Sequence, residues 1–255
     1  MRKPKILITN DDGIFSDGIY ALWEAINQIG NTFIVAPKKN QSGSSHSITL
    51  HDPLQIQHFN RINGFEGWAI NGTPADCVKI AIKSIMEDKP DLLVSGINRG
   101  ANLGTNIIYS GTVSAAMEGT LNGIPSMAIS LDSFKTDKYD VAKYIAVDLS
   151  NYIIENGLPQ GTLLNINVPY CDANSIKGKK ITMQGTQSFI DEFERRTDPR
   201  NRDYFWIKGK IIDKDTSIDY DGKAVKENYV SITPIHSTII NTEYINELKK
   251  YFPDE

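Results

Sequence analysis

The sequence has little cysteine and little histidine. Its 255 residues include two cysteines and four histidines. Cys77 and Cys171 are far apart and form no CxxC pair, which argues against a disulfide framework or a zinc ribbon and favours a reducing compartment. The histidines show no HxH or HExxH spacing, which argues against a zinc cluster. His46 alone lies in a loop of interest, and its role is left open.

Long apolar runs and an excess of one charge are also lacking. No segment approaches the ~18 apolar residues of a membrane span, and the first residues carry no apolar stretch of a signal peptide. We therefore expect a cytoplasmic protein that does not contact a membrane. With 27 basic and 31 acidic residues the net charge is −4, so we expect no binding to a nucleic-acid duplex, which needs a basic face. A single small phosphate ligand fits this charge.

Short apolar runs alternate with amphipathic stretches through the first two thirds of the chain. This alternation predicts an α/β fold, Rossmann-like and doubly wound around a mostly parallel sheet. We expect strands over 5–9, 32–36, 91–95, 126–131 and 162–168, and helices over about 18–30, 74–85, 113–121 and 141–153.

The pattern changes after Pro169, where the apolar runs become short and alternate, as in 204–207 and 229–232. We expect antiparallel hairpins there and a terminal helix over 242–251. The chain is thus predicted to divide into a catalytic α/β core, 1–169, and a hairpin-rich C-terminal extension, 170–255. The dense charge run between Asp191 and Asp203 is interpreted as a solvated loop, with subunit contact or substrate gating as the alternatives.

Polar side chains follow the predicted strands at the sheet edge where ligands bind in such folds. Asp11 and Asp12 come directly after the first strand, and adjacent carboxylates repel unless a cation or hydrogen-bond donors offset their charge. Ser42 and Asn98 lie in the loops after the next two core strands and offer neutral oxygens. Such a set suits Mg²⁺, Mn²⁺ or Ca²⁺. The alternative is a simple turn at Asp12 with Asp11 as a helix cap.

The segment Ser110-Gly111-Thr112 opens a predicted helix. Backbone N–H groups and hydroxyls at such a helix start can hold a phosphate, whereas the simpler alternative is an ordinary N-cap. Asn10 and Asn102 are expected to orient the phosphate. If these polar loops share one pocket, a cation and a phosphate in it indicate phosphotransfer or phosphate hydrolysis.

Several other catalytic templates are absent from the sequence. The first strand is not followed by GxGxxG, and the chain has neither a Walker A loop nor a GxSxG elbow, which argues against NAD, ATP and a serine hydrolase. A covalent aspartyl-phosphate mechanism of the Asp-x-Asp kind would place its nucleophile two residues before Asp12, where the chain has Asn10. This favours attack by a metal-bound water, with Asp11, Asp12 and Asn98 as catalytic residues.

Several segments of the chain match the motifs of a known family: 8–14, 41–49, 71–78, 95–98 and 109–113, with weaker likeness at 165–169, 198–200 and 229–234. On these segments the chain resembles the SurE survival proteins, which are metal-dependent nucleoside-monophosphate phosphatases. The resemblance implies one divalent cation per subunit, Mg²⁺ or Mn²⁺ with Ca²⁺ as another occupant, held by Asp11, Asp12, Ser42 and Asn98. It also implies a nucleoside monophosphate substrate and a homodimer or homotetramer built by the C-terminal part. Two segments depart from the family: 105–106 lacks acidic residues, and so does 237–240.

The expected reaction is therefore the hydrolysis of nucleoside 5′- and 3′-monophosphates to nucleoside and phosphate. An alternative is a non-catalytic nucleotide sensor that uses the same pocket. A metal-dependent glycosidase or deacetylase is a third interpretation, but it would leave the phosphate-binding helix start without a role.

Overall fold

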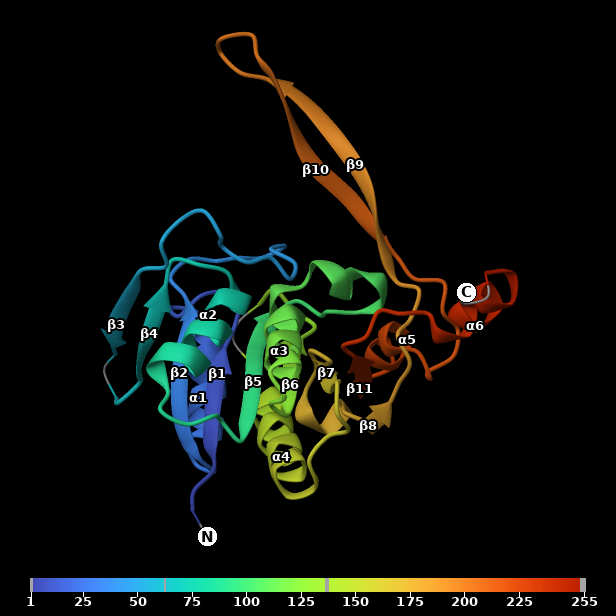
Figure 1. Cartoon of the computed structure of the whole chain (residues 1–255). Coiled ribbons are helices and arrows are strands. Elements are labelled where there is room, and N and C mark those ends of the chain that lie inside the picture. Colours follow the sequence, from blue (N-terminus) through green and yellow to red (C-terminus); the bar gives the residue numbers. More distant parts are fainter. Residues whose placement is uncertain (1, 62, 136–137, 253–255) are drawn as a thin grey trace.

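The computed structural model describes residues 2–61, 63–135 and 138–252, and a nine-stranded sheet runs through this part of the chain (Figure 1). The strand order is β3-β4-β2-β1-β5-β6-β7-β11-β8. Its pairs are parallel except β3–β4 and β7–β11. The predicted doubly wound, mostly parallel fold is thus confirmed. The strands of this sheet are β1 (Lys5–Thr9), β2 (Asn31–Pro37), β3 (Ile56–Asn60), β4 (Glu66–Ile70), β5 (Leu92–Arg99), β6 (Ser126–Leu131), β7 (Thr162–Val168), β8 (Gly178–Ile181) and β11 (Tyr229–His236).

Helices cover both faces of the sheet. Helices α1 (Asp17–Ile26) and α4 (Asp140–Asn156) pack on the face that carries Ile6 and Ile8, and α2 (Pro74–Ile80) and α3 (Gly111–Leu121) on the face that carries Leu7. Because successive strand residues point to opposite faces, all three side chains are fully buried. This double burial explains why the parallel strands read as continuous apolar runs in the sequence.

The largest differences from the predicted helix boundaries are in α1 and α2. Helix α1 begins after Ser16, whose side chain accepts a hydrogen bond from the Ile19 N–H, and it ends at Ile26 instead of Gly30. The predicted helix over 74–85 consists of α2 and a following π-helical turn, Ala81–Ile85. The start of α2 is fixed by a reciprocal capping box between Thr73 and Asp76.

The region after Pro169 corresponds only in part to the expected hairpins. Strands β9 (Ser188–Thr197) and β10 (Asp203–Ile212) form a long antiparallel hairpin that projects from the body (Figure 1). The charge run 191–203 belongs largely to these strands instead of to a loop, because oppositely charged neighbours such as Arg195 and Asp203 pair across them. The segment 229–232 lies in β11, which pairs with β7 and β8 in the main sheet. The division at residue 169 stays a prediction.

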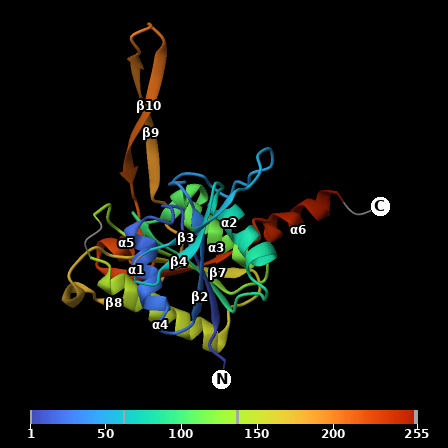
Figure 2. The ribbon, with the colours of Figure 1, turned by 90° about the vertical axis from the view of Figure 1, so that its left-hand side faces the viewer.

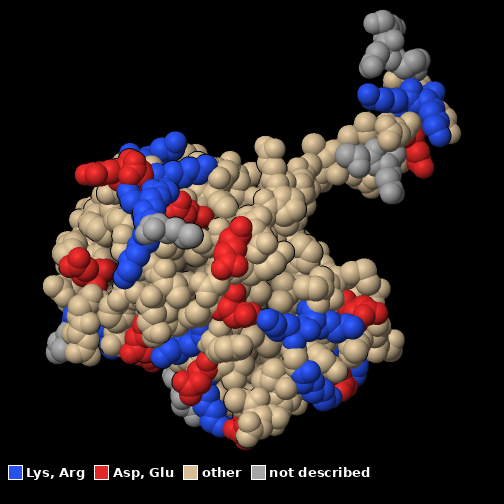
Figure 3. Space-filling model, turned by 90° about the horizontal axis from the view of Figure 1, so that it is seen from below, with Lys and Arg blue, Asp and Glu red and all other residues tan. Residues whose placement is uncertain are grey.

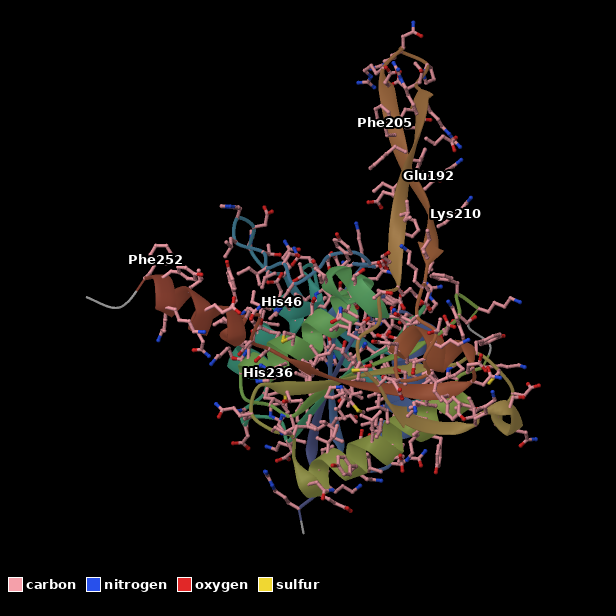
Figure 4. The ribbon with its side chains drawn as sticks, turned by 90° about the vertical axis from the view of Figure 1, so that its right-hand side faces the viewer. His46, Glu192, Phe205, Lys210, His236 and Phe252 are labelled. Atoms are coloured by element: carbon pink, nitrogen blue, oxygen red, sulfur yellow. The ribbon has the colours of Figure 1, made fainter. Side chains whose placement is uncertain are left out.

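The hairpin and helix α6 (Thr242–Tyr251) leave the body in different directions (Figure 2). Both carry large exposed apolar side chains, among them Phe205 on the hairpin and Phe252 just after α6, which Figure 4 shows far from the body. On the face shown in Figure 3, basic and acidic residues are interspersed over the body. Within the described ranges, no helix is both long enough and apolar enough to cross a membrane.

The order of the central strands creates a switch point at the carboxyl ends of β1 and β5. Strand β1 pairs with β2 on one side and with β5 on the other. The helices that lead to these two strands, α1 and α2, cover opposite faces, so the loops after β1 and β5 diverge at this point. A Cβ on Gly18 would lie 2.0 Å from the Ile97 carbonyl oxygen, which shows how closely the start of α1 approaches the end of β5. In folds of this kind, such a switch point is the expected place for a ligand.

Candidate active site

Asp11 lies where the ends of two strands meet the start of a helix. Its backbone carbonyl accepts a hydrogen bond of 2.7 Å from Gln41 N–H in the loop after β2. Its carboxylate accepts one of 2.5 Å from the Thr112 hydroxyl in the first turn of α3. A Cβ on Gly111 would lie 2.7 Å from the Asp11 Cβ, so only glycine allows this approach. The segments that carry Asp11, Gln41 and Thr112 therefore lie together, as the sequence predicts.

Asp12 joins the same place to the end of β5. Its carboxylate accepts hydrogen bonds of 3.2 Å from the Arg99 backbone N–H and of 3.2 Å from the Asn40 side chain. The Arg99 guanidinium lies 3.7 Å from it. Sequence reasoning missed Arg99 and Asn40, although Arg99 directly follows Asn98 at a strand end. Arg99 thus provides a positive charge beside the carboxylate pair.

Burial makes the ionised form of both carboxylates costly. Burial, more than any other cause, raises the pKa of Asp11 from 3.8 to about 6, although the Thr112 hydrogen bond lowers it and the neighbouring Asp12 raises it further. The pKa of Asp12 is also raised by burial, against the lowering effect of Arg99 and Asn40. A bound cation would offset the cost of two adjacent buried negative charges. The arrangement therefore fits a divalent cation.

Asn98 and Ser42, the neutral ligands expected for that cation, each adjoin a residue whose backbone N–H bonds to Asp12 or Asp11. Asn98 is 9 % exposed, and its Nδ2 donates to the Gly100 carbonyl, which leaves Oδ1 as the end available to a ligand. Ser42 is exposed in a turn closed by the Ser44 N–H and the Gln41 carbonyl, with Gly43 at φ +74°. Among the described residues no three His, Cys, Asp or Glu side chains form a metal cluster. A cation here would need such neutral oxygens.

The start of α3 faces a carboxylate of the protein itself. Thr112 is fully buried and donates to Asp11, while the Ser110 side chain caps the helix by accepting from the Val113 N–H at 3.1 Å. Ser110 is therefore the N-cap of α3, which was the simpler alternative for this segment. The positive end of the helix stabilises the Asp11 charge, because helix N-termini favour anions. The hydroxyl of Thr112 is thus committed to Asp11.

The side chains of Asn10 and Asn102 serve the loops that carry them. The Asn10 amide nitrogen donates to the Gly13 carbonyl and the Ser16 hydroxyl, and its oxygen accepts from the Gly13 N–H. Both donors of this amide are used within its own loop, and the expected contact to a phosphate stays a prediction. The Asn102 side chain donates to Ser130 at 2.8 Å, and its backbone is held by Asn167. It fixes the loop after β5 to the sheet.

A second hydroxyl that the sequence analysis did not single out lies at the site. The Ser44 Oγ is buried and, among the described residues, has no hydrogen-bond partner. A Cβ on Gly111 would lie 3.0 Å from it, so this atom lies at the start of α3 beside Asp11. The signal that could have identified it is its place in the polar loop that also carries Ser42.

Known proteins similar to this chain match it over nearly its full length. The family model "Survival protein SurE" matches residues 6–191. The "5'-nucleotidase SurE" of Thermosipho africanus is 44% identical over 250 residues, which cover 98% of this chain and 98% of that protein. The "5'-nucleotidase SurE" of Natranaerobius thermophilus is 43% identical over 258 residues, which cover 98% of this chain and 100% of that protein.

A solved structure agrees in fold as well as in sequence. The SurE protein from Aquifex aeolicus superposes with a TM-score of 0.84 at 39% identity, and the match covers 98% of this chain and 100% of that one. The resemblance inferred from the motifs is therefore confirmed. By its matched family model, its full-length relatives and its fold, the chain belongs to the SurE survival protein family.

Proposed function

We propose that this protein is a phosphomonoesterase that hydrolyses nucleoside 5′-monophosphates, and also 3′-monophosphates, to nucleoside and phosphate. The observation that carries the proposal is the pair of buried carboxylates, Asp11 and Asp12, at the switch point of the sheet beside the start of α3. The names of the similar proteins support the nucleotide substrate. They also favour an enzyme over a non-catalytic nucleotide sensor that uses the same pocket.

We infer one divalent cation per subunit, Mg²⁺ or Mn²⁺, with Ca²⁺ as another occupant. Asp11, Asp12, Asn98 and Ser42 would hold it, since they combine two buried negative charges with neutral oxygens. When bound, such an ion polarises phosphoryl oxygens and lowers the pKa of a bound water. The Thr112 hydroxyl orients Asp11 for this purpose.

The groups beside the carboxylates suit an anionic substrate. The Arg99 side chain is 42% exposed and lies beside Asp12, so its guanidinium can reach a phosphoryl oxygen from that side. We retain Ser110 and Gly111, at the positive end of α3, as phosphate-binding residues, and we add the unpartnered hydroxyl of Ser44. These donors would stabilise the negative charge that develops in the transition state.

The assembly and the location stay predictions. The exposed apolar side chains of the β9–β10 hairpin and of α6, such as Trp206 and Tyr251, support a homodimer or homotetramer, because such residues on projecting elements are usually covered by a partner. A monomeric mass by light scattering at tens of micromolar would contradict this. We continue to expect a cytoplasmic protein.

Asp11→Asn tests the function directly. The amide keeps the shape of the side chain but removes the charge, so phosphate release from nucleoside monophosphates should fall at least about a hundredfold at fixed Mn²⁺, as for loss of a key electrostatic group. Asp17→Asn, an exposed carboxylate at the start of α1, serves as the matched control and should keep full turnover. Equal turnover of Asp11→Asn and the wild type would contradict the proposal.

The same substitution should stabilise the metal-free protein. Because the pKa of Asp11 is raised to about 6 in the folded state, ionisation of Asp11 destabilises the fold as the pH rises from about 4 to 6, and the full effect is present above pH 6. A shift of about two pKa units corresponds to about 3 kcal/mol. In chelator at pH 8, urea denaturation should therefore show Asp11→Asn to be more stable than the wild type, with a smaller difference at pH 5. A less stable variant at pH 8 would show that the buried charge is not costly.

Thr112→Val should impair the site because it removes the hydroxyl that donates to Asp11 while keeping the side-chain volume. A hydrogen bond to a charged group contributes about 1.5–3 kcal/mol, so the Mn²⁺ concentration for half-maximal phosphate release should rise about ten- to a hundredfold. Thr112→Ser retains a donor and should remain close to the wild type. If the valine and serine variants respond alike to Mn²⁺, the hydrogen bond has no role at the site.

A further inference from the structure

His46 belongs to the loop that carries Ser42 and Ser44, but its side chain pairs with a residue on α3. Its Nε2 lies 2.9 Å from the Oε2 of Glu118, two turns after the start of that helix. Figure 4 shows His46 on the body of the molecule, well away from the hairpin. The pair thus joins the loop after β2 to the helix whose first turn faces Asp11.

Glu118 is a buried carboxylate with partners on every side. Its side chain is 5% exposed and also receives hydrogen bonds of 2.8 Å from Lys79 on α2 and of 2.8 Å from Asn122 at the end of α3. Burial, the largest effect, raises the pKa of Glu118, but the hydrogen bonds from His46, Lys79 and Asn122 together hold it below its usual value. Glu118 is therefore ionised, and His46 must donate its Nε2 proton to it.

The stretch of chain between Gln41 and His46 has a backbone conformation that other contacts must stabilise. Gly43 and Ser45 both have positive φ, at +74° and +56°. For serine this conformation is unfavourable, so contacts with the rest of the protein must hold it. The beginning of this stretch is fixed by two hydrogen bonds. The Gln41 N–H donates to the Asp11 carbonyl, and the Asn40 side chain donates to the Asp12 carboxylate.

The end of the loop is fixed to the segment before α3 and to α3 itself. The Ser45 N–H donates to the Tyr109 carbonyl at 3.2 Å, and the Ser45 hydroxyl donates to the Ile108 carbonyl at 2.6 Å. The His46–Glu118 contact is the next one along the chain and, unlike the two Ser45 contacts, it is made to a buried charge. Because hydrogen bonds to charged groups are the strongest of their kind, it should contribute more than the two Ser45 contacts to holding the 42–45 segment.

We propose that His46 and Glu118 are positioning residues, which hold the 42–45 segment against Asp11 and the start of α3 so that the hydroxyls of Ser42 and Ser44 stay at the cation and phosphate site. Neither residue touches the substrate in this account. The inference rests on the proposed phosphomonoesterase function and on its cation.

The test is Mn²⁺ binding to the full-length protein by titration calorimetry, without substrate. His46→Ala should weaken Mn²⁺ about tenfold, the effect of losing about 1.4 kcal/mol of support. His46→Gln keeps an N–H donor and should recover most of the affinity. In assays with p-nitrophenyl phosphate at saturating Mn²⁺, His46→Ala should raise KM more than it lowers kcat, because the loop holds donors for the phosphate.

Two controls separate positioning from a general loss of stability. Lys79→Ala removes another partner of Glu118 but leaves the loop contact, and His51→Ala removes an exposed histidine farther along the same connection. Both should bind Mn²⁺ as the wild type does. If Lys79→Ala weakens Mn²⁺ as much as His46→Ala, or if His46→Ala binds with wild-type affinity, the positioning role is wrong.

A coupled substitution identifies the partner. Glu118→Gln should weaken Mn²⁺ to a similar extent, and adding His46→Ala to it should cause little further loss, since both act through one contact. Fully additive losses would contradict the pairing. A wild-type protein that neither binds Mn²⁺ nor releases phosphate would overturn the proposed function itself, whereas normal wild-type behaviour with unaffected variants would overturn only this inference.

Discussion

Two neighbouring carboxylates that are withdrawn from water constrain the rest of the site. Burial of Asp11 and Asp12 disfavours their charged forms, and the hydrogen bonds from Thr112, Arg99 and Asn40 only partly offset this. A fold selected for stability alone would avoid such a pair. Its presence at the point where the strand order reverses is explained if the protein exchanges stability for the capacity to bind a cation beside a phosphate.

The structure around the carboxylates is arranged to hold three segments of the chain together. Gly111 permits the start of α3 to approach Asp11, and Gly18 permits α1 to approach the end of β5. In the loop after β2, the 41–46 segment is fixed at both ends, to Asp11 by Gln41 and to Glu118 by His46. Each contact joins residues far apart in the sequence, so the site forms only when the sheet has assembled. This explains how flexible-looking polar loops can provide a defined set of oxygens.

Much of the fold could be predicted because buried parallel strands and amphipathic helices leave periodic patterns in the sequence. The strand-end rule likewise predicted Asp11 directly after β1, whereas Asn98, which was expected in the loop after a strand ending at residue 95, lies inside β5. The hydrogen-bond partners of side chains could not be predicted, because they depend on how each helix is oriented against the sheet. Thr112, for example, was expected to bind phosphate, and its hydroxyl donates to Asp11. Strand β11 was assigned to a hairpin because an alternating pattern does not reveal which strand it pairs with. The Asn10 contacts to Gly13 and Ser16 are local and could have been recognised as an Asx-type turn.

The central claim is that Asp11, Asp12 and Asn98 surround one divalent cation. Crystals of the protein grown with Mn²⁺ and measured at a wavelength where manganese scatters anomalously test this most directly. The account predicts a single strong anomalous peak within coordination distance of both aspartate carboxylates and of the Asn98 side-chain oxygen. An active, Mn²⁺-dependent protein whose anomalous peak lies elsewhere, with water alone between these side chains, would contradict it.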